Sequence, residues 1–150
     1  MLAFALRNDG WYLRQDIIWN KPNPMPESVR DRCTKSHEYI FLLSKNQNYY
    51  FDVDAIKEPT RRKRSVWDIN KKAYKDAHFA VYPPELIKPC ILAGSQKNDI
   101  ILDPFIGSGT TAMVAKELGR DYIGCELHEE YGKLMQKRIG EVRGNLEEFL

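Results

Sequence analysis

Apolar and polar positions along the chain predict an α/β protein with a strand, a turn and a helix at its centre. Residues 100–102 (Ile-Ile-Leu) form a short apolar run, which is typical of a buried parallel strand. Residues 111–118 have helical spacing, and Gly119 follows where a glycine commonly ends a helix. A second apolar run over 121–125 predicts another strand. Together these features indicate one βαβ unit.

The remaining pattern predicts further elements on both sides of this unit. They are a helix over 1–6, a strand over 11–20, strands over 39–43 and 49–52 joined as a β-hairpin, a helix from 83 to Gly94 and an amphipathic helix over 128–143. Aromatic and β-branched residues favour the strands, and a pair of prolines followed by an acid favours the start at 83. We interpret the apolar positions of the last helix as core packing.

A glycine turn separates the first strand of the βαβ unit from its helix. Residues 103–111 read Asp-Pro-Phe-Ile-Gly-Ser-Gly-Thr-Thr. Gly107 and Gly109 allow a tight turn whose backbone can approach a ligand closely. Either Thr110 or Thr111 is expected to cap the helix that follows. The turn therefore has the features of a ligand-binding loop.

An acidic residue, Glu126, ends the second strand of the unit. It follows the glycines by about twenty residues, the distance at which such a unit brings a carboxylate to a ribose. Only two of the three glycines of the dinucleotide motif are present, which argues against pyrophosphate binding. The unit therefore predicts a site for an adenosine-type cofactor.

Length indicates how many domains the chain can form, and the distribution of charge bears on nucleic-acid binding. A chain of 150 residues is long enough for one domain with a core. The net charge of +2 is too small to imply nucleic-acid binding by itself, but residues 61–64 (Arg-Arg-Lys-Arg) form a block of four cations. Such a block is either a solvated face or a set of phosphate contacts.

Cysteine spacing and hydropathy bear on the compartment. The three cysteines are far apart and form neither a metal-ligand spacing nor a disulfide framework, which indicates a reducing cytoplasm. No apolar run reaches the length of a membrane span, and no signal peptide opens the sequence. We therefore expect a cytoplasmic protein with no metal and no membrane partner.

The turn over 103–111 resembles the cofactor motif of the DNA methyltransferases that methylate exocyclic amino groups, N6 of adenine or N4 of cytosine. In that family the motif binds S-adenosylmethionine, and many members have a permuted order in which the cofactor half comes last. The resemblance covers residues 11–140 and implies a prokaryotic or phage-like context. This chain is expected to be a C-terminal portion of such an enzyme.

The resemblance implies an α/β fold, a partial Rossmann-like methyltransferase fold with a mostly parallel sheet and a β-hairpin. Residues 1–150 are expected to form a single, incomplete methyltransferase domain. Within it, residues 53–75 correspond to a short basic segment for target recognition, and residues 76–143 correspond to the cofactor-binding half.

The resemblance also implies the ligands and their sites, with S-adenosylmethionine as cofactor and double-stranded DNA as partner. The implied cofactor-binding residues are Phe79, Pro83, Glu85, Asp103, Phe105, Gly107, Gly109, Thr110, Thr111 and Glu126. The implied DNA-binding residues are His37, near a flipped target base, and the cations Arg61, Arg62, Lys63 and Arg64. By its residue type alone, His37 favours a structural role over a role in DNA binding.

The catalytic motif of the family is absent from these 150 residues. That motif is an Asp, Asn or Ser followed by two prolines and an aromatic residue. Residues 82–85 (Tyr-Pro-Pro-Glu) have only the prolines, and residues 23–26 and 103–105 also fail to match. No catalytic residue is therefore assigned, and the motif is expected before Met1 or on an upstream fragment that acts as a partner.

The sequence therefore predicts part of a site-specific DNA methyltransferase that acts on cytosine N4 or adenine N6, and it does not decide between the two bases. One alternative is a non-catalytic remnant that binds DNA or the cofactor. A second alternative, a nicotinamide oxidoreductase, is disfavoured by the missing third glycine.

Overall fold

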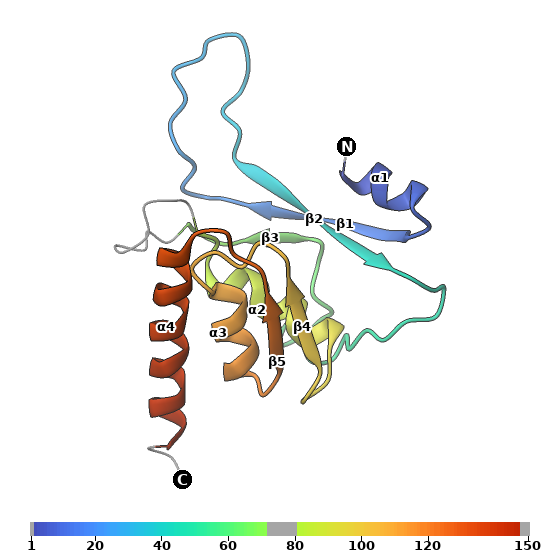
Figure 1. Cartoon of the computed structure of the whole chain (residues 1–150). Coiled ribbons are helices and arrows are strands. Elements are labelled where there is room, and N and C mark those ends of the chain that lie inside the picture. The colour runs from blue at the N-terminus through green and yellow to red at the C-terminus, as the bar shows by residue number, and fades with distance from the viewer. Residues whose placement is uncertain (1, 72–80, 148–150) are drawn as a thin grey trace. The chain divides into compact units, whose positions relative to one another are not determined.

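The computed structural model describes residues 2–71 and 81–147, with side chains described as far as Gly140 (Figure 1). Contacts divide the chain into a first unit, Met1–Lys71, and a second unit, Lys72–Leu150. Within the described ranges, no helix is both long and apolar enough to cross a membrane. Among the same residues, no three His, Cys, Asp or Glu side chains gather into a group that could hold a metal ion.

The first unit contains a three-stranded mixed sheet in the order β2-β1-β3. Its elements are α1 (Leu2–Asn8), β1 (Tyr12–Asn20), β2 (His37–Ser44) and β3 (Val66–Asp68). The central strand β1 runs antiparallel to β2 and parallel to β3. Alternation along the strands buries Ile17, Trp19 and Trp67, which form the apolar side of the sheet.

The predicted β-hairpin, in which residues 39–43 pair with residues 49–52, is wrong. Residues 39–43 lie in β2, which pairs with β1 over its whole length, whereas residues 49–52 form no strand. Asp52 accepts hydrogen bonds from the backbone N–H groups of Asp54 (3.1 Å) and Ala55 (2.9 Å), and these bonds turn the chain. The nine-residue β1 offers a longer ladder than a four-residue return strand.

The described part of the second unit, residues 81–147, contains a two-stranded parallel sheet with three helices. Its elements are α2 (Pro84–Gly94), β4 (Ile100–Asp103), α3 (Thr110–Glu117), β5 (Asp121–Gly124) and α4 (Glu129–Glu147). The strands pair from Ile100↔Asp121 to Asp103↔Gly124, with α3 as the crossover. The predicted βαβ unit is confirmed. The fold is α/β, but the described residues form two small sheets, one of them mixed, in place of one mostly parallel sheet.

The helices pack against one face of the β4–β5 sheet. Ile101 and Tyr122, which are register partners, pack against the buried cluster of Ile91, Val114 and Ala115. The alternating residues point the other way, so Ile100, Leu102 and Ile123 are 61%, 65% and 54% exposed. The prediction that residues 100–102 form a buried strand is therefore correct for the face that carries Ile101 only. Among the described residues, helices cover that face of the sheet and leave the other face exposed.

Candidate functional site

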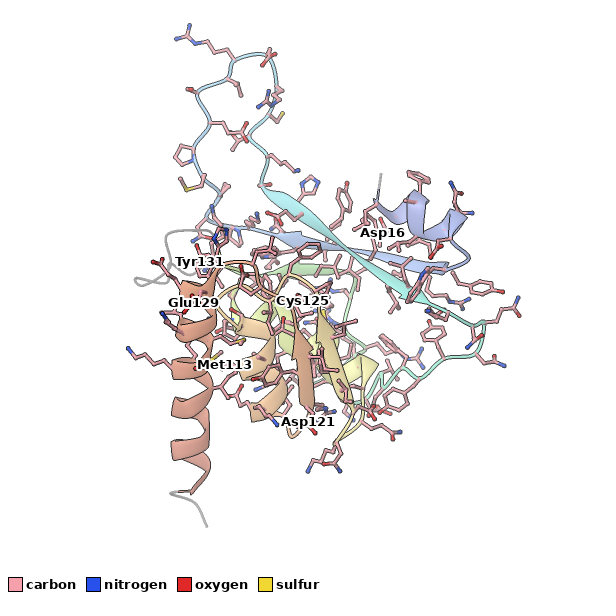
Figure 2. The ribbon with its side chains drawn as sticks, viewed as in Figure 1. Asp16, Met113, Asp121, Cys125, Glu129 and Tyr131 are labelled. Atoms are coloured by element: carbon pink, nitrogen blue, oxygen red, sulfur yellow. The ribbon has the colours of Figure 1, made fainter. Side chains whose placement is uncertain are left out.

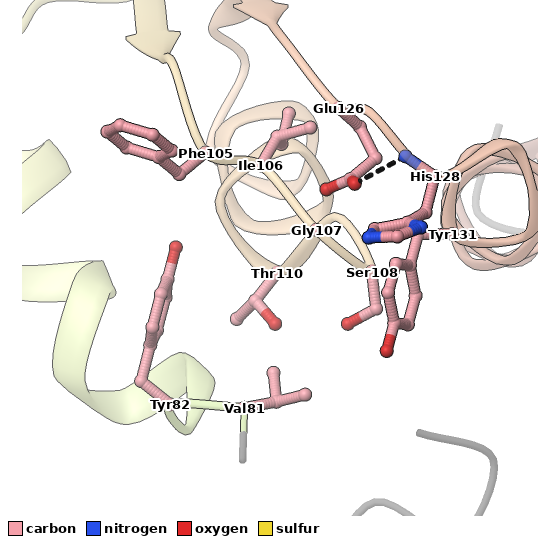
Figure 3. A pocket seen from close by; sticks show the side chains of 10 residues that line it. All are labelled: Val81, Tyr82, Phe105, Ile106, Gly107, Ser108, Thr110, Glu126, His128 and Tyr131. Carbon is pink, nitrogen blue, oxygen red and sulfur yellow. Dashed lines mark hydrogen bonds between the residues drawn. The ribbon is translucent and has the colours of Figure 1, made fainter. Parts of the chain in front are cut away.

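A cavity of about 350 Å³ lies in the second unit beyond the carboxyl ends of β4 and β5 (Figure 3). Open α/β sheets bind their ligands at this edge of the strands. The lining residues are Val81, Tyr82, Phe105, Ile106, Gly107, Ser108, Thr110, Glu126, His128 and Tyr131. The described part of the wall is mostly apolar and aromatic, with Glu126 as its carboxylate, which suits an adenosine-type ligand better than a highly charged one.

Some of the predicted cofactor-binding residues line the cavity, and others lie elsewhere in the second unit. Those that line the cavity are Phe105, Gly107, Thr110 and Glu126. Asp103, Gly109 and Thr111 lie in the same turn but contact other parts of the second unit. Pro83 is buried immediately before α2, Glu85 is exposed on the first turn of that helix, and Phe79 falls outside the described residues.

Both turn glycines adopt left-handed backbone conformations. Gly107 has φ +52° and Gly109 has φ +82°, and Gly109 is the N-cap of α3. The predicted threonine cap is wrong, because α3 has no side-chain cap hydrogen bond. The hydroxyl of Thr111 donates to Asp103 Oδ2 (2.5 Å), and the hydroxyl oxygen of Thr110 accepts from Arg138 (3.3 Å). The side chains of both threonines therefore hold the turn instead of capping the helix that begins at Thr110.

The two turn glycines should respond differently to alanine. A Cβ on Gly109 would lie 2.9 Å from Met135 Cβ and 3.3 Å from Met135 Cα, whereas a Cβ on Gly107 meets nothing closer than 4.0 Å. We expect Gly107→Ala to cost only left-handed backbone strain, about 1–2 kcal/mol of unfolding free energy. Gly109→Ala adds overpacking of about 1–3 kcal/mol. Urea unfolding measures both variants, and equal losses would contradict this packing of α4 on the turn.

A hydrogen-bond network beside the cavity joins the start of α2 to the glycine turn. The hydroxyl of Tyr82 lies 2.5 Å from Thr111 Oγ1 and 3.2 Å from Asp103 Oδ2. The other carboxylate oxygen, Asp103 Oδ1, accepts from the Phe105 N–H (3.0 Å). Burial raises the pKa of Tyr82 to about 12, so its hydroxyl stays protonated at neutral pH. Sequence reasoning missed Tyr82, which it weighed only as the first residue of a failed catalytic motif.

Removing the Tyr82 hydroxyl should change stability in alkali. Because its pKa in the folded chain lies above the unfolded value of 10, its contribution is complete below pH 10 and is lost as the pH rises towards 12. Tyr82→Phe should cost about 1 kcal/mol at pH 8. Melting temperatures of the two proteins should then converge between pH 10 and 12. Curves that stay parallel over that range would show that this hydroxyl does not titrate late.

The carboxylate of Glu126 lies two residues beyond the end of β5, across the cavity edge from Gly107. Its Oε1 accepts the N–H of His128 (2.8 Å), and its Oε2 lies 4.0 Å from the position of a Cβ on Gly107 (Figure 3). The His128 and Tyr131 rings meet edge to face with centroids 5.9 Å apart. Tyr131 stands near the start of α4 (Figure 2). Its helical spacing indicated core packing, and the structure instead places it at the cavity.

The predicted DNA-binding residues lie in the first unit on opposite sides of β1. His37 begins β2, where its ring meets Tyr39 edge to face at 5.3 Å. The cations at 61–64 precede β3. Arg61 pairs with Glu58 at 2.5 Å, and this hydrogen bond lowers the pKa of Glu58. Lys63 lies over the ring of Trp67 at 4.9 Å, whereas Arg62 and Arg64 are exposed.

Comparison with known families decides the classification. The family model described as DNA methylase, of the N6/N4 methyltransferase type, matches residues 1–137. The chain belongs to the N6/N4 DNA methylase family. The resemblance seen at the glycine turn is thereby confirmed over residues 1–137, a range that includes the first unit.

Individual relatives place the chain within this family. It is 57% identical over 145 residues to the type II methyltransferase M.SmaI of Serratia marcescens, covering 92% of this chain and 50% of that protein. The crystal structure of an M1.HpyAVI–SAM complex matches with a TM-score of 0.75 and 32% identity, covering 91% of this chain and 66% of that one. The cytosine-N4-specific PvuII methyltransferase shares the fold, with a TM-score of 0.81 at 21% identity over 91% and 54% of the two chains. The chain thus spans about half the length of the curated relatives it matches.

Proposed function

We propose that this chain is the cofactor-binding portion, with part of the DNA-binding surface, of a site-specific DNA methyltransferase. The enzyme would transfer a methyl group from S-adenosylmethionine to an exocyclic amino group, cytosine N4 or adenine N6. One observation carries the proposal: in a member of the DNA methylase family, the glycine turn and the Glu126 carboxylate line one cavity at the carboxyl ends of parallel strands.

The residues of the cavity fit S-adenosylmethionine. Glu126 offers two carboxylate oxygens, and neighbouring ribose hydroxyls are matched by a bidentate acceptor. The absence of a side chain at Gly107 leaves the turn backbone open on the side of Glu126 Oε2. The rings of Tyr82, Phe105 and Tyr131 supply apolar walls for the adenine base. When bound, the cofactor supplies a sulfonium methyl group, and these residues would hold and orient it.

A titration with two ligands tests the cofactor class. Isothermal calorimetry on the 150-residue chain should show binding of S-adenosylhomocysteine and much weaker binding of NAD. S-adenosylhomocysteine carries one adenosine and an amino acid, for which the turn has room, whereas NAD needs a pyrophosphate site that a third glycine would support. Tighter binding of NAD would favour a nicotinamide oxidoreductase and contradict the proposal.

The exposed cations are proposed to contact DNA phosphates. Arg62 and Arg64 are the better candidates within the block, because Glu58 and Trp67 already engage its other two members. Replacing both with Ala should lower the slope of log affinity against log salt by about 0.9 for each phosphate that is no longer neutralised. Filter binding to a DNA duplex at several salt concentrations measures this slope.

A matched control removes two exposed cations from the second unit, in a Lys97→Ala, Lys133→Ala variant. It changes the net charge by the same amount and should leave the slope closer to that of the unmodified chain. If the two double variants behave alike, the cations at 61–64 are a solvated face and their proposed role is wrong.

A further inference from the structure

A buried arginine supports the glycine turn from α4. Arg138 is 7% exposed, and its Nη1 donates to the Ser108 carbonyl oxygen (3.0 Å), to Ser108 Oγ (3.0 Å) and to Thr110 Oγ1 (3.3 Å). Its Nη2 lies 3.8 Å from the sulfur of Met113, on α3 (Figure 2). Burying a guanidinium is costly, so this residue does more than fill space in the core.

The donor chemistry of arginine dictates how the two hydroxyls are used. A guanidinium has only N–H donors, so any oxygen that it binds must act as an acceptor there. Ser108 Oγ and Thr110 Oγ1 therefore accept from Arg138, and each hydroxyl keeps its own proton for another partner. Both residues line the cavity, and their hydroxyl oxygens face one another in the close-up view (Figure 3).

We propose that Arg138 is a positioning residue for the ligand's anionic end. By occupying the acceptor side of the Ser108 hydroxyl, it makes Ser108 a donor towards a carboxylate in the cavity, while the buried Thr110 hydroxyl stays with the turn. The inference rests on the proposed function, in which that carboxylate belongs to the amino acid part of S-adenosylmethionine. The adenosine part, at Glu126, does not depend on Arg138.

Two ligands that differ only at the amino acid part test this role. S-adenosylhomocysteine has the carboxylate, and 5′-methylthioadenosine has the same nucleoside without it. In calorimetric titrations of the 150-residue chain, Arg138→Gln should weaken S-adenosylhomocysteine about tenfold or more, because the charge-assisted hydrogen bonds are removed. The affinity for methylthioadenosine should stay within about twofold, a selectivity that general destabilisation would not produce.

Neighbouring variants serve as controls. Lys137→Gln removes an exposed cation one residue away and should change neither affinity. Ser108→Ala removes one donor directly and should give the same selective loss as Arg138→Gln. If Arg138 acts through Ser108, the double variant loses less than the product of the two single effects. Should Arg138→Gln fail to fold, Arg138→Lys is measured in its place, with the same selective loss expected because an ammonium lacks the planar fork.

The outcomes distinguish failure of the positioning role of Arg138 from failure of the proposed function. Equal weakening of both ligands in the Arg138 variants, or no weakening, overturns the positioning role while leaving the proposed function intact. If neither Arg138 variant folds, an equal loss of both ligands in Ser108→Ala overturns it. If the unmodified chain binds neither ligand, the proposed function fails and the inference fails with it.

Discussion

The 150-residue chain by itself is expected to transfer no detectable methyl group to DNA. Members of this family hold the target amino group with a polar residue before two prolines and stack the base on the aromatic residue after them. Residues 82–85 keep only the prolines: the Tyr82 hydroxyl is engaged with Asp103 and Thr111, and Glu85 is exposed on α2. Each missing transition-state interaction costs about 10²–10³ in rate.

The prediction is tested by adding the missing part of the enzyme as a separate polypeptide. The segment of the Serratia marcescens relative that this chain does not match, supplied as a second polypeptide, should restore transfer of tritiated methyl groups to duplex DNA. The same mixture with Glu126→Ala should lose most of the restored activity. Enzyme-like turnover by the chain alone would show that catalytic residues lie within it. Failure of every mixture despite cofactor binding would favour a non-catalytic remnant.

Replacing Glu126 should have the largest effect on cofactor affinity. Glu126→Ala removes the cavity's only described carboxylate, and hydrogen bonds to a charged group are worth about 1.5–3 kcal/mol. Affinity for S-adenosylhomocysteine should therefore fall about tenfold to a hundredfold or more. In contrast to Arg138→Gln, this variant should weaken methylthioadenosine as well, because both ligands share the ribose.

Two further variants control for charge and for shape. Glu130→Ala removes an exposed acid from the first turn of α4 and should leave both affinities unchanged. Glu126→Gln keeps one acceptor oxygen and the side-chain volume, so its affinity should lie between those of the unmodified chain and Glu126→Ala. Calorimetry that gives one affinity for all of these proteins would reject the ribose role of Glu126.

The sequence by itself determined the βαβ unit and the position of its acid. Strand, helix and turn signals over 100–125 are local, because periodicity and glycine conformation act within a few residues. Glu126 follows from the length of that unit, which brings the ends of β4 and β5 to one edge. The resemblance at the glycine turn indicated the family for the same reason, since its nine residues are contiguous.

The tertiary structure decided which distant groups meet. The β2 strand could pair with a later segment or with β1, and the longer ladder with β1 prevailed. Tyr82 reaches Thr111 across 29 positions, and Arg138 reaches Ser108 across 30. Such pairings depend on how helices pack on the sheet and on where buried donors find acceptors, and neither condition leaves a periodic signal in the sequence. Tyr131 and Arg138 both fall in the helix predicted over 128–143, and only packing placed one at the cavity and the other on the turn.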